Sequence, residues 1–263
     1  MTSLHEAKAV FFDVDDTLYD FERSMRFAFE HVHAKFPDVF AAHKVDDLER
    51  AYWRHYRGMP EAQKVGVINT DPARFRHMMW RGALEALAMH GDARRAEGTA
   101  ATLADAAGLD ALAMRVAEEA QRERPRHWRE AMYEGAHALL TDLKHLRILG
   151  AITNGPPALQ RPKLEAIGWR DFFEPHRVFV SGEFGARKPD PSIFLAAAKS
   201  AGVEPQECVM VGDAREFDMP SKAVGFRTIL FVAHRGRPDV SNDVHPPDAI
   251  ATSYAEIRKM LLG

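Results

Sequence analysis

The chain has 263 residues, of which 46% are hydrophobic, and its formal net charge is −3 at pH 7. This hydrophobic content is typical of a packed core and argues against a disordered chain. A charge so close to zero argues against the broad basic surface that binds nucleic acid polymers. The length suits one large domain or two modest ones.

Cysteine usage and the apolar runs bear on the location of the protein. Cys208 is the only cysteine, so no internal disulfide can form and a reducing cytoplasm is expected. Glu6 precedes the first apolar run and Asp13 interrupts it, so the segment does not resemble a signal peptide. No stretch approaches the roughly 18 apolar residues that span a bilayer. We therefore expect a cytoplasmic protein without a membrane partner.

The first predicted element is a strand at Ala9 to Asp13 that is followed at once by acidic residues. Asp13 and Asp15 are spaced i, i+2 and would face the same way if the strand continued, with Thr17 at i+4. Two adjacent carboxylates repel each other, so a positive group is needed between them. The pattern indicates a site for a divalent metal.

A long helical block is predicted next, from about residue 21 to residue 127. Apolar residues recur at helical spacing, and Asp71-Pro72 has the pattern of a helix start. The alanine-rich segment 100–120 is expected to form two helices separated by Gly108. We expect four or five helices in this block.

From Tyr133 onward predicted helices and strands alternate, as in an α/β protein with a parallel sheet and helices on both faces. The strand at Ala9 to Asp13 must join that sheet, so the helical block is an insertion after the first strand. We predict a Rossmann-like, doubly wound catalytic core (1–18 and 129–263) and a helical cap domain (19–128). The predicted helices are 135–146, 157–167, 191–201 and a short one at 218–224, and the strands are 151–153, 177–180, 208–211 and 228–232.

Polar residues follow each of these strands, at the sheet edge where open α/β sheets bind ligands. Each group has a simpler structural interpretation: Asp16 or Thr17 as a helix cap, Asp190 as the cap of the next helix, and the others as turn or solvated residues. Those interpretations do not explain why all four groups reach one edge in this order. The groups are Asp13-Val14-Asp15-Asp16-Thr17, Thr153-Asn154-Gly155, Lys188-Pro189-Asp190, and Gly212-Asp213 with Asp218.

These four motifs, in this order, resemble those of the haloacid dehalogenase-like superfamily of phosphohydrolases. The helical insertion lies between the first and second motifs, as in members with a type 1 cap. The resemblance covers almost the whole chain, although the cap is similar only in position and helicity.

The resemblance implies a mechanism in which Asp13 is the nucleophile and forms an aspartyl-phosphate. Asp15 is implied as general acid and base, and Lys188 as the cation that balances the carboxylates. The cofactor is expected to be Mg²⁺, with ligands Asp13, the backbone carbonyl of Asp15, Asp213 and Asp218. Phosphoryl oxygens are expected to contact Thr153, Asn154 and the loop after Asp13, which includes Thr17.

Three other functions stay open. Superfamily dehalogenases resemble Asp-x-Tyr-Gly-Thr at the first motif, so the aspartate at position 15 favours phosphoryl transfer. A phosphomutase would use the same aspartyl-phosphate and differ mainly in the cap. A non-catalytic binding protein is disfavoured because no expected catalytic position has been lost.

The substrate is expected to be selected by the cap, whose joints are predicted near residues 19–22 and 129–133. Thr153-Asn154-Gly155-Pro156 with Leu159-Gln160 looks most like small-metabolite phosphatases, which suggests a nucleoside monophosphate or a sugar phosphate. The alternative for the aromatic cap residues is core packing. We expect a monomer or a homodimer, and the candidate pocket residues are Arg23, Tyr52, Trp53, His55 and Arg57.

Overall fold

The computed structural model describes residues 3–90 and 106–263. Its contacts divide the chain into two compact units, Met1–Phe21 with Trp128–Gly263, and Glu22–His127. The predicted domain boundaries after residues 18 and 128 lie beside these divisions. We refer to the two units as the core unit and the cap unit.

The core unit is built on a six-stranded sheet in the order β3-β2-β1-β4-β5-β6, and every pair of neighbouring strands is parallel. This confirms the predicted α/β, Rossmann-like fold class. The strands are β1 (Ala9–Phe12), β2 (Ile148–Thr153), β3 (Val178–Val180), β4 (Cys208–Gly212), β5 (Arg227–Phe231) and β6 (Ala249–Ala251).

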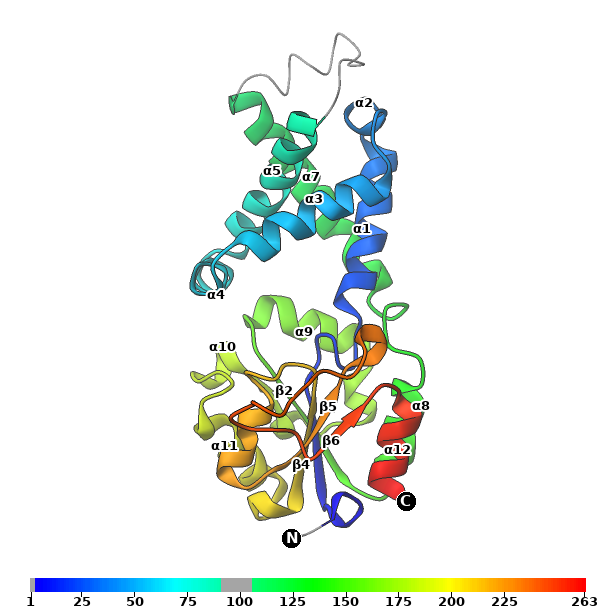
Figure 1. Cartoon of the computed structure of the whole chain (residues 1–263), viewed down its shortest axis with the longest axis vertical. Helices are drawn as coiled ribbons and strands as arrows, with labels where there is room; N and C mark the ends of the chain where they lie inside the picture. Colours follow the sequence, from blue (N-terminus) through cyan, green and yellow to red (C-terminus); the bar gives the residue numbers. More distant parts are fainter. Residues whose placement is uncertain (1–2, 91–105) are drawn as a thin grey trace. The chain divides into compact units, whose positions relative to one another are not determined.

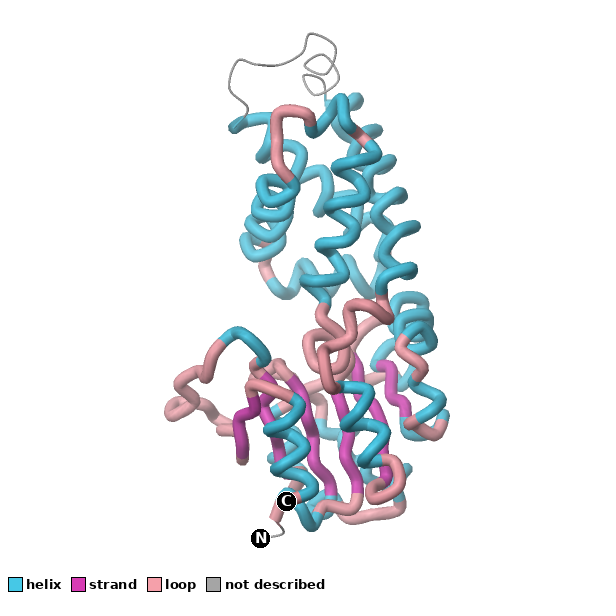
Figure 2. Tube along the Cα trace, turned by 90° about the vertical axis from the view of Figure 1, so that its right-hand side faces the viewer, coloured by secondary structure: helices cyan, strands magenta, loops and turns pink. Residues whose placement is uncertain are grey.

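Helices cover both faces of the sheet (Figures 1 and 2). Alternate residues of β1 point to opposite faces, as the pleat of a strand requires. Val10 and Phe12 pack with one set of helices, whereas Ala9 and Phe11 pack with another. A strand buried on both sides is continuously apolar, which explains the run at the start of the sequence.

Of the core-unit helices, α8, α9 and α11 were predicted, with shifts at the ends of α8 and α9, whereas α10 and α12 were not. One face of the sheet packs against α8, α9 and α12, and the other packs against α11. The α-helices are α8 (Ala136–Leu143), α9 (Pro157–Ala166), α10 (Ser181–Phe184), α11 (Pro191–Ala201) and α12 (Tyr254–Leu262).

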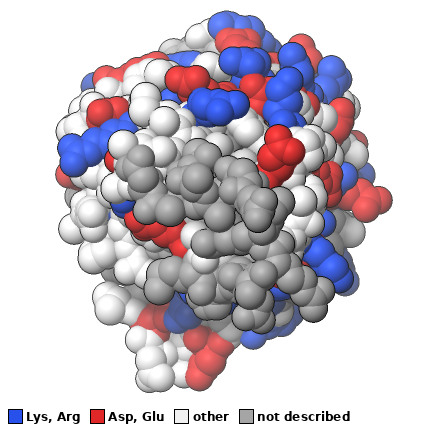
Figure 3. Space-filling model, turned by 90° about the horizontal axis from the view of Figure 1, so that it is seen from above, with Lys and Arg blue, Asp and Glu red and all other residues white. Residues whose placement is uncertain are grey.

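The cap unit is helical throughout the residues that the structure describes. An aromatic cluster joins α1, α3 and α5, where Phe29 packs edge-on against Tyr52, Trp53 and Trp80. The helices are α1 (Phe21–Lys35), α2 (Pro37–Phe40), α3 (Val45–Gly58), α4 (Glu61–Thr70), α5 (Pro72–His90) and α7 (Ala106–Glu123). On the face seen in Figure 3, basic side chains lie among acidic ones.

Several predicted elements were wrong in detail. The described part of the cap has six helices rather than four or five, and Gly108 lies inside α7 instead of between two helices. The rest of the predicted alanine-rich pair, before residue 106, lies outside the described residues. The segment predicted as a short helix at 218–224 is a 3-10 helix, Met219–Val224.

Two C-terminal elements, β6 and α12, were not predicted. Strand β6 has three residues and follows an irregular segment, so it is too short to show an alternation of apolar and polar residues. Helix α12 could have been predicted from its first residues, because Ser-x-x-Glu before an apolar run is a known helix-start pattern. In the structure, the Ser253 hydroxyl accepts a hydrogen bond from the backbone N–H of Glu256.

Candidate active site

The candidate site lies at the carboxyl ends of the central strands. Asp13 directly follows β1, and its backbone N–H donates to Val211 of β4 at 2.9 Å. Thr153 is the last residue of β2, and Asp213 follows the last residue of β4. Because all these strands are parallel, the three residues reach the same edge of the sheet.

Lys188 lies between two of the predicted acidic residues and is almost completely buried. Its Nζ is 2.7 Å from Asp13 Oδ1 and 2.6 Å from Asp218 Oδ1, and its side chain is 2% exposed. Burial by itself lowers the pKa of Lys188, but the carboxylates of Asp13 and Asp218 outweigh burial and raise it. The lysine is therefore a fixed positive charge beside Asp13.

Three carboxylates meet beside this lysine. Oxygen atoms of Asp13, Asp213 and Asp218 lie within 4.8 Å of one another. Burial raises the pKa of Asp213 to about 7, and the negative charges of Asp218 and Asp16 add to the shift. The pKa of Asp13 is also raised by burial, and Lys188 opposes that shift.

This donor set fits a small divalent cation. Carboxylate oxygens are the ligands that Mg²⁺ prefers, and a cation would offset the burial and the mutual repulsion that raise the carboxyl pKa values. Asp218 is fixed for this role, since its Oδ2 accepts from the backbone N–H of Ala214 at 3.0 Å. A Cβ on Gly212 would lie 2.2 Å from that Oδ2, so only glycine allows Asp218 to approach.

A second cation, Arg235, contacts the opposite side of the cluster. Its guanidinium lies 2.9 Å from Asp213 Oδ2 and 3.2 Å from Asp16 Oδ2. Asp16 also accepts from the backbone N–H of Phe21 at 3.0 Å, so it caps α1 as one structural interpretation predicted. Arg235 follows β5 in a 3-10 helix, and the sequence analysis did not single it out.

Asp15 is placed apart from the three clustered carboxylates. Its Oδ1 accepts from Lys163 Nζ and its Oδ2 accepts from Gln160 Nε2 at 3.0 Å, both on α9. The two aspartates of the first motif thus have different partners, as the separate predicted roles require. The predicted contact between the Asp15 carbonyl and a metal stays a prediction.

Asn154 is used to hold a loop of the protein. Its Oδ1 accepts from the backbone N–H of Lys188 at 2.9 Å, and its Nδ2 donates to the Lys188 carbonyl at 3.0 Å. The predicted contact between Asn154 and phosphate stays a prediction, because the amide nitrogen has a second N–H beside the one that binds Lys188. The neighbouring Thr153 is buried at the end of β2.

Thr17 lies in the loop that follows Asp13, and its predicted contact with phosphate stays a prediction. Its side chain is fully buried, and its hydroxyl has no hydrogen-bond partner among the described residues. Its carbonyl accepts from the hydroxyl of Tyr254, the first residue of α12. The capping role of Asp190 is clear, because its Oδ1 accepts from the Ser192 N–H at 2.8 Å.

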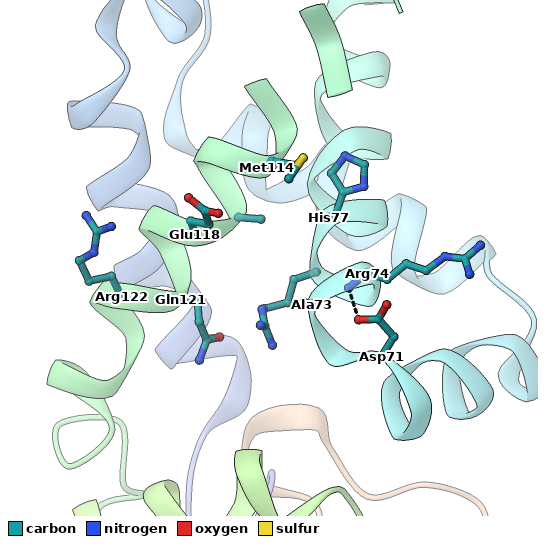
Figure 4. Close-up of a pocket in the computed structure, with 10 residues that line it drawn as sticks. Asp71, Ala73, Arg74, His77, Met114, Glu118, Gln121 and Arg122 are labelled. Carbon is teal, nitrogen blue, oxygen red and sulfur yellow. Dashed lines mark hydrogen bonds between the residues drawn. The ribbon is translucent and has the colours of Figure 1, made fainter. Parts of the chain in front are cut away.

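The cap unit contains a cavity of about 530 Å³ between α5 and α7 (Figure 4). Gln121 and Met114 line it from α7, and Arg74 and Arg122 extend outward on opposite sides in Figure 4. Burial lowers the pKa of Arg76, and the charge of Arg124 lowers it further. The lining residues are Asp71, Ala73, Arg74, Arg76, His77, Met114, Ala117, Glu118, Gln121 and Arg122.

The predicted cap pocket residues do not line this cavity. Tyr52 and Trp53 belong to the buried aromatic cluster, which is the core packing given as their alternative. His55 packs against α5, where a Cβ on Gly82 would lie 2.3 Å from its Nδ1. Arg23 and Arg57 are exposed.

No helix within the described ranges is both long enough and apolar enough to cross a membrane. Cys208 is buried in β4, and burial raises the pKa of its thiol to about 12.

Comparison with known proteins places the chain in a family. The family model described as haloacid dehalogenase-like hydrolase matches residues 7–223. The chain is 31% identical over 233 residues to a phosphoserine phosphatase of Thermus thermophilus, covering 88% of this chain and 91% of that protein.

Shorter matches involve other phosphatases. An N-acylneuraminate-9-phosphatase of Mus musculus is 35% identical over 111 residues, which is 41% of this chain and 44% of that protein. Among solved structures, the putative HAD-hydrolase YfnB from Bacillus subtilis, bound to magnesium, aligns over 97% of this chain and 99% of its own. Its TM-score is 0.71 and its sequence identity 19%, which supports the fold.

The predicted family and enzyme class, phosphoric monoester hydrolase, are confirmed by the family match and the phosphatase relatives. The chain belongs to the haloacid dehalogenase-like hydrolase family.

Proposed function

We propose that this protein is a Mg²⁺-dependent phosphatase that hydrolyses a small phosphate monoester through an aspartyl-phosphate on Asp13. The observation that carries the proposal is the buried contact of Lys188 Nζ with both Asp13 and Asp218 at the carboxyl edge of the sheet. A carboxylate beside a fixed cation can attack phosphorus, because positioning and charge neutralisation supply most of the rate in phosphoryl transfer.

The first step forms a bond between an Asp13 carboxylate oxygen and phosphorus and breaks the bond from phosphorus to the ester oxygen. Asp15 donates a proton to that leaving oxygen, so an alcohol departs. In the second step Asp15 takes a proton from water, whose oxygen attacks phosphorus and releases inorganic phosphate from Asp13. Lys188 favours the ionised form of Asp13 throughout.

The metal would be held by Asp13, Asp213 and Asp218, with the Asp15 carbonyl proposed as a further ligand. When bound, Mg²⁺ would neutralise negative charge on the carboxylates and on the phosphoryl oxygens. The cluster of three buried carboxylates supports this assignment. YfnB, which has a similar fold, is described as bound to magnesium.

The substrate is proposed to be a small phosphorylated metabolite, such as a nucleoside monophosphate or a sugar phosphate. The relatives that support this range include phosphoserine, N-acylneuraminate-9-phosphate and glyceraldehyde 3-phosphate phosphatases, and a pyrimidine 5′-nucleotidase. A cytoplasmic location and a monomer or homodimer are part of the proposal.

The Asp13→Asn variant tests the nucleophile. An amide cannot form the acyl phosphate, so phosphate release in Mg²⁺ should fall to background on the best substrate of a phosphoester panel. Acid-quenched wild-type protein should carry one added phosphoryl group on the peptide that contains Asp13, and the variant should carry none.

The control is the circular dichroism spectrum and melting of the variant, which should resemble those of the wild type. Substantial Mg²⁺-dependent turnover by a folded Asp13→Asn protein would refute the proposal. Isomerised product without phosphate release would indicate the phosphomutase alternative, and halide release from a 2-haloacid would indicate a dehalogenase.

A further inference from the structure

A pair of side chains on α9, Gln160 and Lys163, lies against the Asp15 carboxylate. Both side chains are buried, whereas 31% of the Asp15 side chain is exposed. Lys163 Nζ donates to Asp15 Oδ1, and Gln160 Nε2 donates to Asp15 Oδ2 at 3.0 Å. Each oxygen of this carboxylate is therefore held by a different donor.

The two donors also hold each other. Lys163 Nζ donates to Gln160 Oε1 at 3.3 Å. Gln160 Nε2 has a second acceptor, the Asn154 carbonyl, at 3.1 Å. The network thus joins Asp15 to the segment whose side-chain amide holds the Lys188 backbone. Residues spaced i, i+3 share one face of a helix, so α9 presents both donors to the same carboxylate.

The backbone at Gly155 leaves room for the Gln160 side chain. Gly155 has a φ of +145°, and a Cβ there would lie 2.8 Å from Gln160 Nε2. The Lys163 ammonium also lies 5.2 Å from the centre of the Tyr19 ring, which follows the first motif in the chain. Burying a lysine is costly unless its charge is paired, and Asp15 supplies that pairing.

We propose that Lys163 and Gln160 are positioning residues that fix the Asp15 carboxylate for proton transfer to the leaving group. They act through Asp15 and have no contact with the reacting phosphorus in this assignment. The inference rests on the proposed function, because it requires that Asp15 protonates a leaving oxygen.

If these residues position Asp15, then replacing them should lower the reaction rate by a factor that depends on the leaving group of the substrate. An alkyl phosphate expels a basic alkoxide and needs a well-placed acid, whereas an activated aryl phosphate expels a stable phenolate with little assistance. A merely structural role would reduce the rates for both esters alike. The ratio of the two rates therefore separates positioning from general damage to the fold.

The test compares kcat/KM of Lys163→Met and Gln160→Met with that of the wild type, on an alkyl phosphate substrate and on p-nitrophenyl phosphate in Mg²⁺. This parameter covers the chemical steps as far as leaving-group release. We expect Lys163→Met to lower the value for the alkyl ester roughly 10- to 100-fold more than that for the aryl ester, because a displaced acid loses part of the roughly 10²- to 10⁴-fold that general acid catalysis contributes. Gln160→Met should shift the same ratio in the same direction by a smaller factor.

Arg161→Met is the matched control, because Arg161 lies on the same helix and pairs with Glu183 instead of Asp15. It should leave the alkyl-to-aryl ratio unchanged. Equal losses for both esters in a folded Lys163→Met protein, or no loss for either, would overturn this inference alone. A wild-type protein inactive toward every phosphoester would overturn the proposed function and this inference with it.

Discussion

At the scale of single residues, polar side chains of the site bind other groups of the protein. The amide of Asn154 holds the backbone of Lys188, a contact that its place in a strand-end motif did not predict. The sequence motifs identified the edge of the sheet where these residues lie, but they did not reveal which groups each side chain contacts. Those contacts depend on how loops from distant parts of the chain pack together, and a local sequence pattern carries no information about that packing.

Asn154→Ala should reduce both activity and stability. Removing two hydrogen bonds to the Lys188 backbone should cost about 1 to 2 kcal/mol of unfolding free energy. Displacement of Lys188 from Asp13 should lower kcat by about tenfold or more, since small misplacements at a reacting group are costly. Urea unfolding and steady-state kinetics measure the two effects.

Asn242→Ala is the comparison variant, because Asn242 is exposed in a turn of the core unit. It should change neither the stability nor the kinetics. An Asn154→Ala protein with wild-type kcat would show that the amide does not position Lys188.

At the scale of elements, prediction succeeded where a periodic pattern was long or a cap was strong. The bounds of α11 were predicted to the residue, because Asp190-Pro191 marks its start and Gly202 its end. The first strand was correct apart from its last residue, since a continuous apolar run is typical of a buried parallel strand. Arg235 was missed because it lies in a three-residue 3-10 helix, which is too short to show a periodic pattern.

The side chain of Asp248, the residue before β6, binds groups at the β5 side of the sheet. Asp248 Oδ2 accepts from the backbone N–H of Thr228 at 2.8 Å, and Lys222 Nζ lies 3.0 Å from its Oδ1. Burial raises the pKa of Asp248, but the hydrogen bonds from Lys222 and Thr228 outweigh it and hold the pKa below 3.8. The ionised carboxylate therefore stabilises the end of the sheet.

Asp248→Asn should lower the free energy of unfolding by about 1 kcal/mol at neutral pH. A folded-state pKa below the unfolded value means that the contribution is complete above pH 3.8 and disappears as pH falls through the folded pKa. The difference between variant and wild type should consequently shrink as the pH falls below 3.8. Urea titrations at a series of pH values measure it.

Asp142→Asn supplies the control, because its ion pair with Arg258 is at the surface, with side chains 40% and 56% exposed. Exposed pairs contribute little, so this variant should match the wild type at both ends of the range. A pH-independent loss in Asp248→Asn would show that the charge of Asp248 is not involved.

At the scale of the whole molecule, the chain leaves and re-enters the core unit at adjacent points. The Asp20 N–H donates to Ala131 at 2.8 Å, and the Tyr133 N–H donates to Leu18 at 3.2 Å. These backbone bonds join the two ends of the insertion within the core unit itself. The two segments of the core unit are therefore hydrogen-bonded to each other at the point where the insertion begins and ends.

Replacing residues 22–127 by a short flexible linker should leave a folded core. Loop closure depends only weakly on loop length, and the sheet and its covering helices belong to the retained segments. We expect cooperative thermal melting and a circular dichroism spectrum with reduced helix content. Loss of any cooperative transition would show that the cap is needed for the core to fold.

The position of β1 in the middle of the sheet affects how the protein is made. Ala9 pairs with Ile148 on one side and with Cys208 on the other, so β1 is synthesised long before either of its partners. At about 5 to 20 residues per second, its first partner emerges roughly 7 to 28 seconds after it does. A fully apolar strand is exposed for that interval, while the helices of the insertion can form from local contacts. The nascent chain is thus expected to depend on chaperones that bind the segment containing β1.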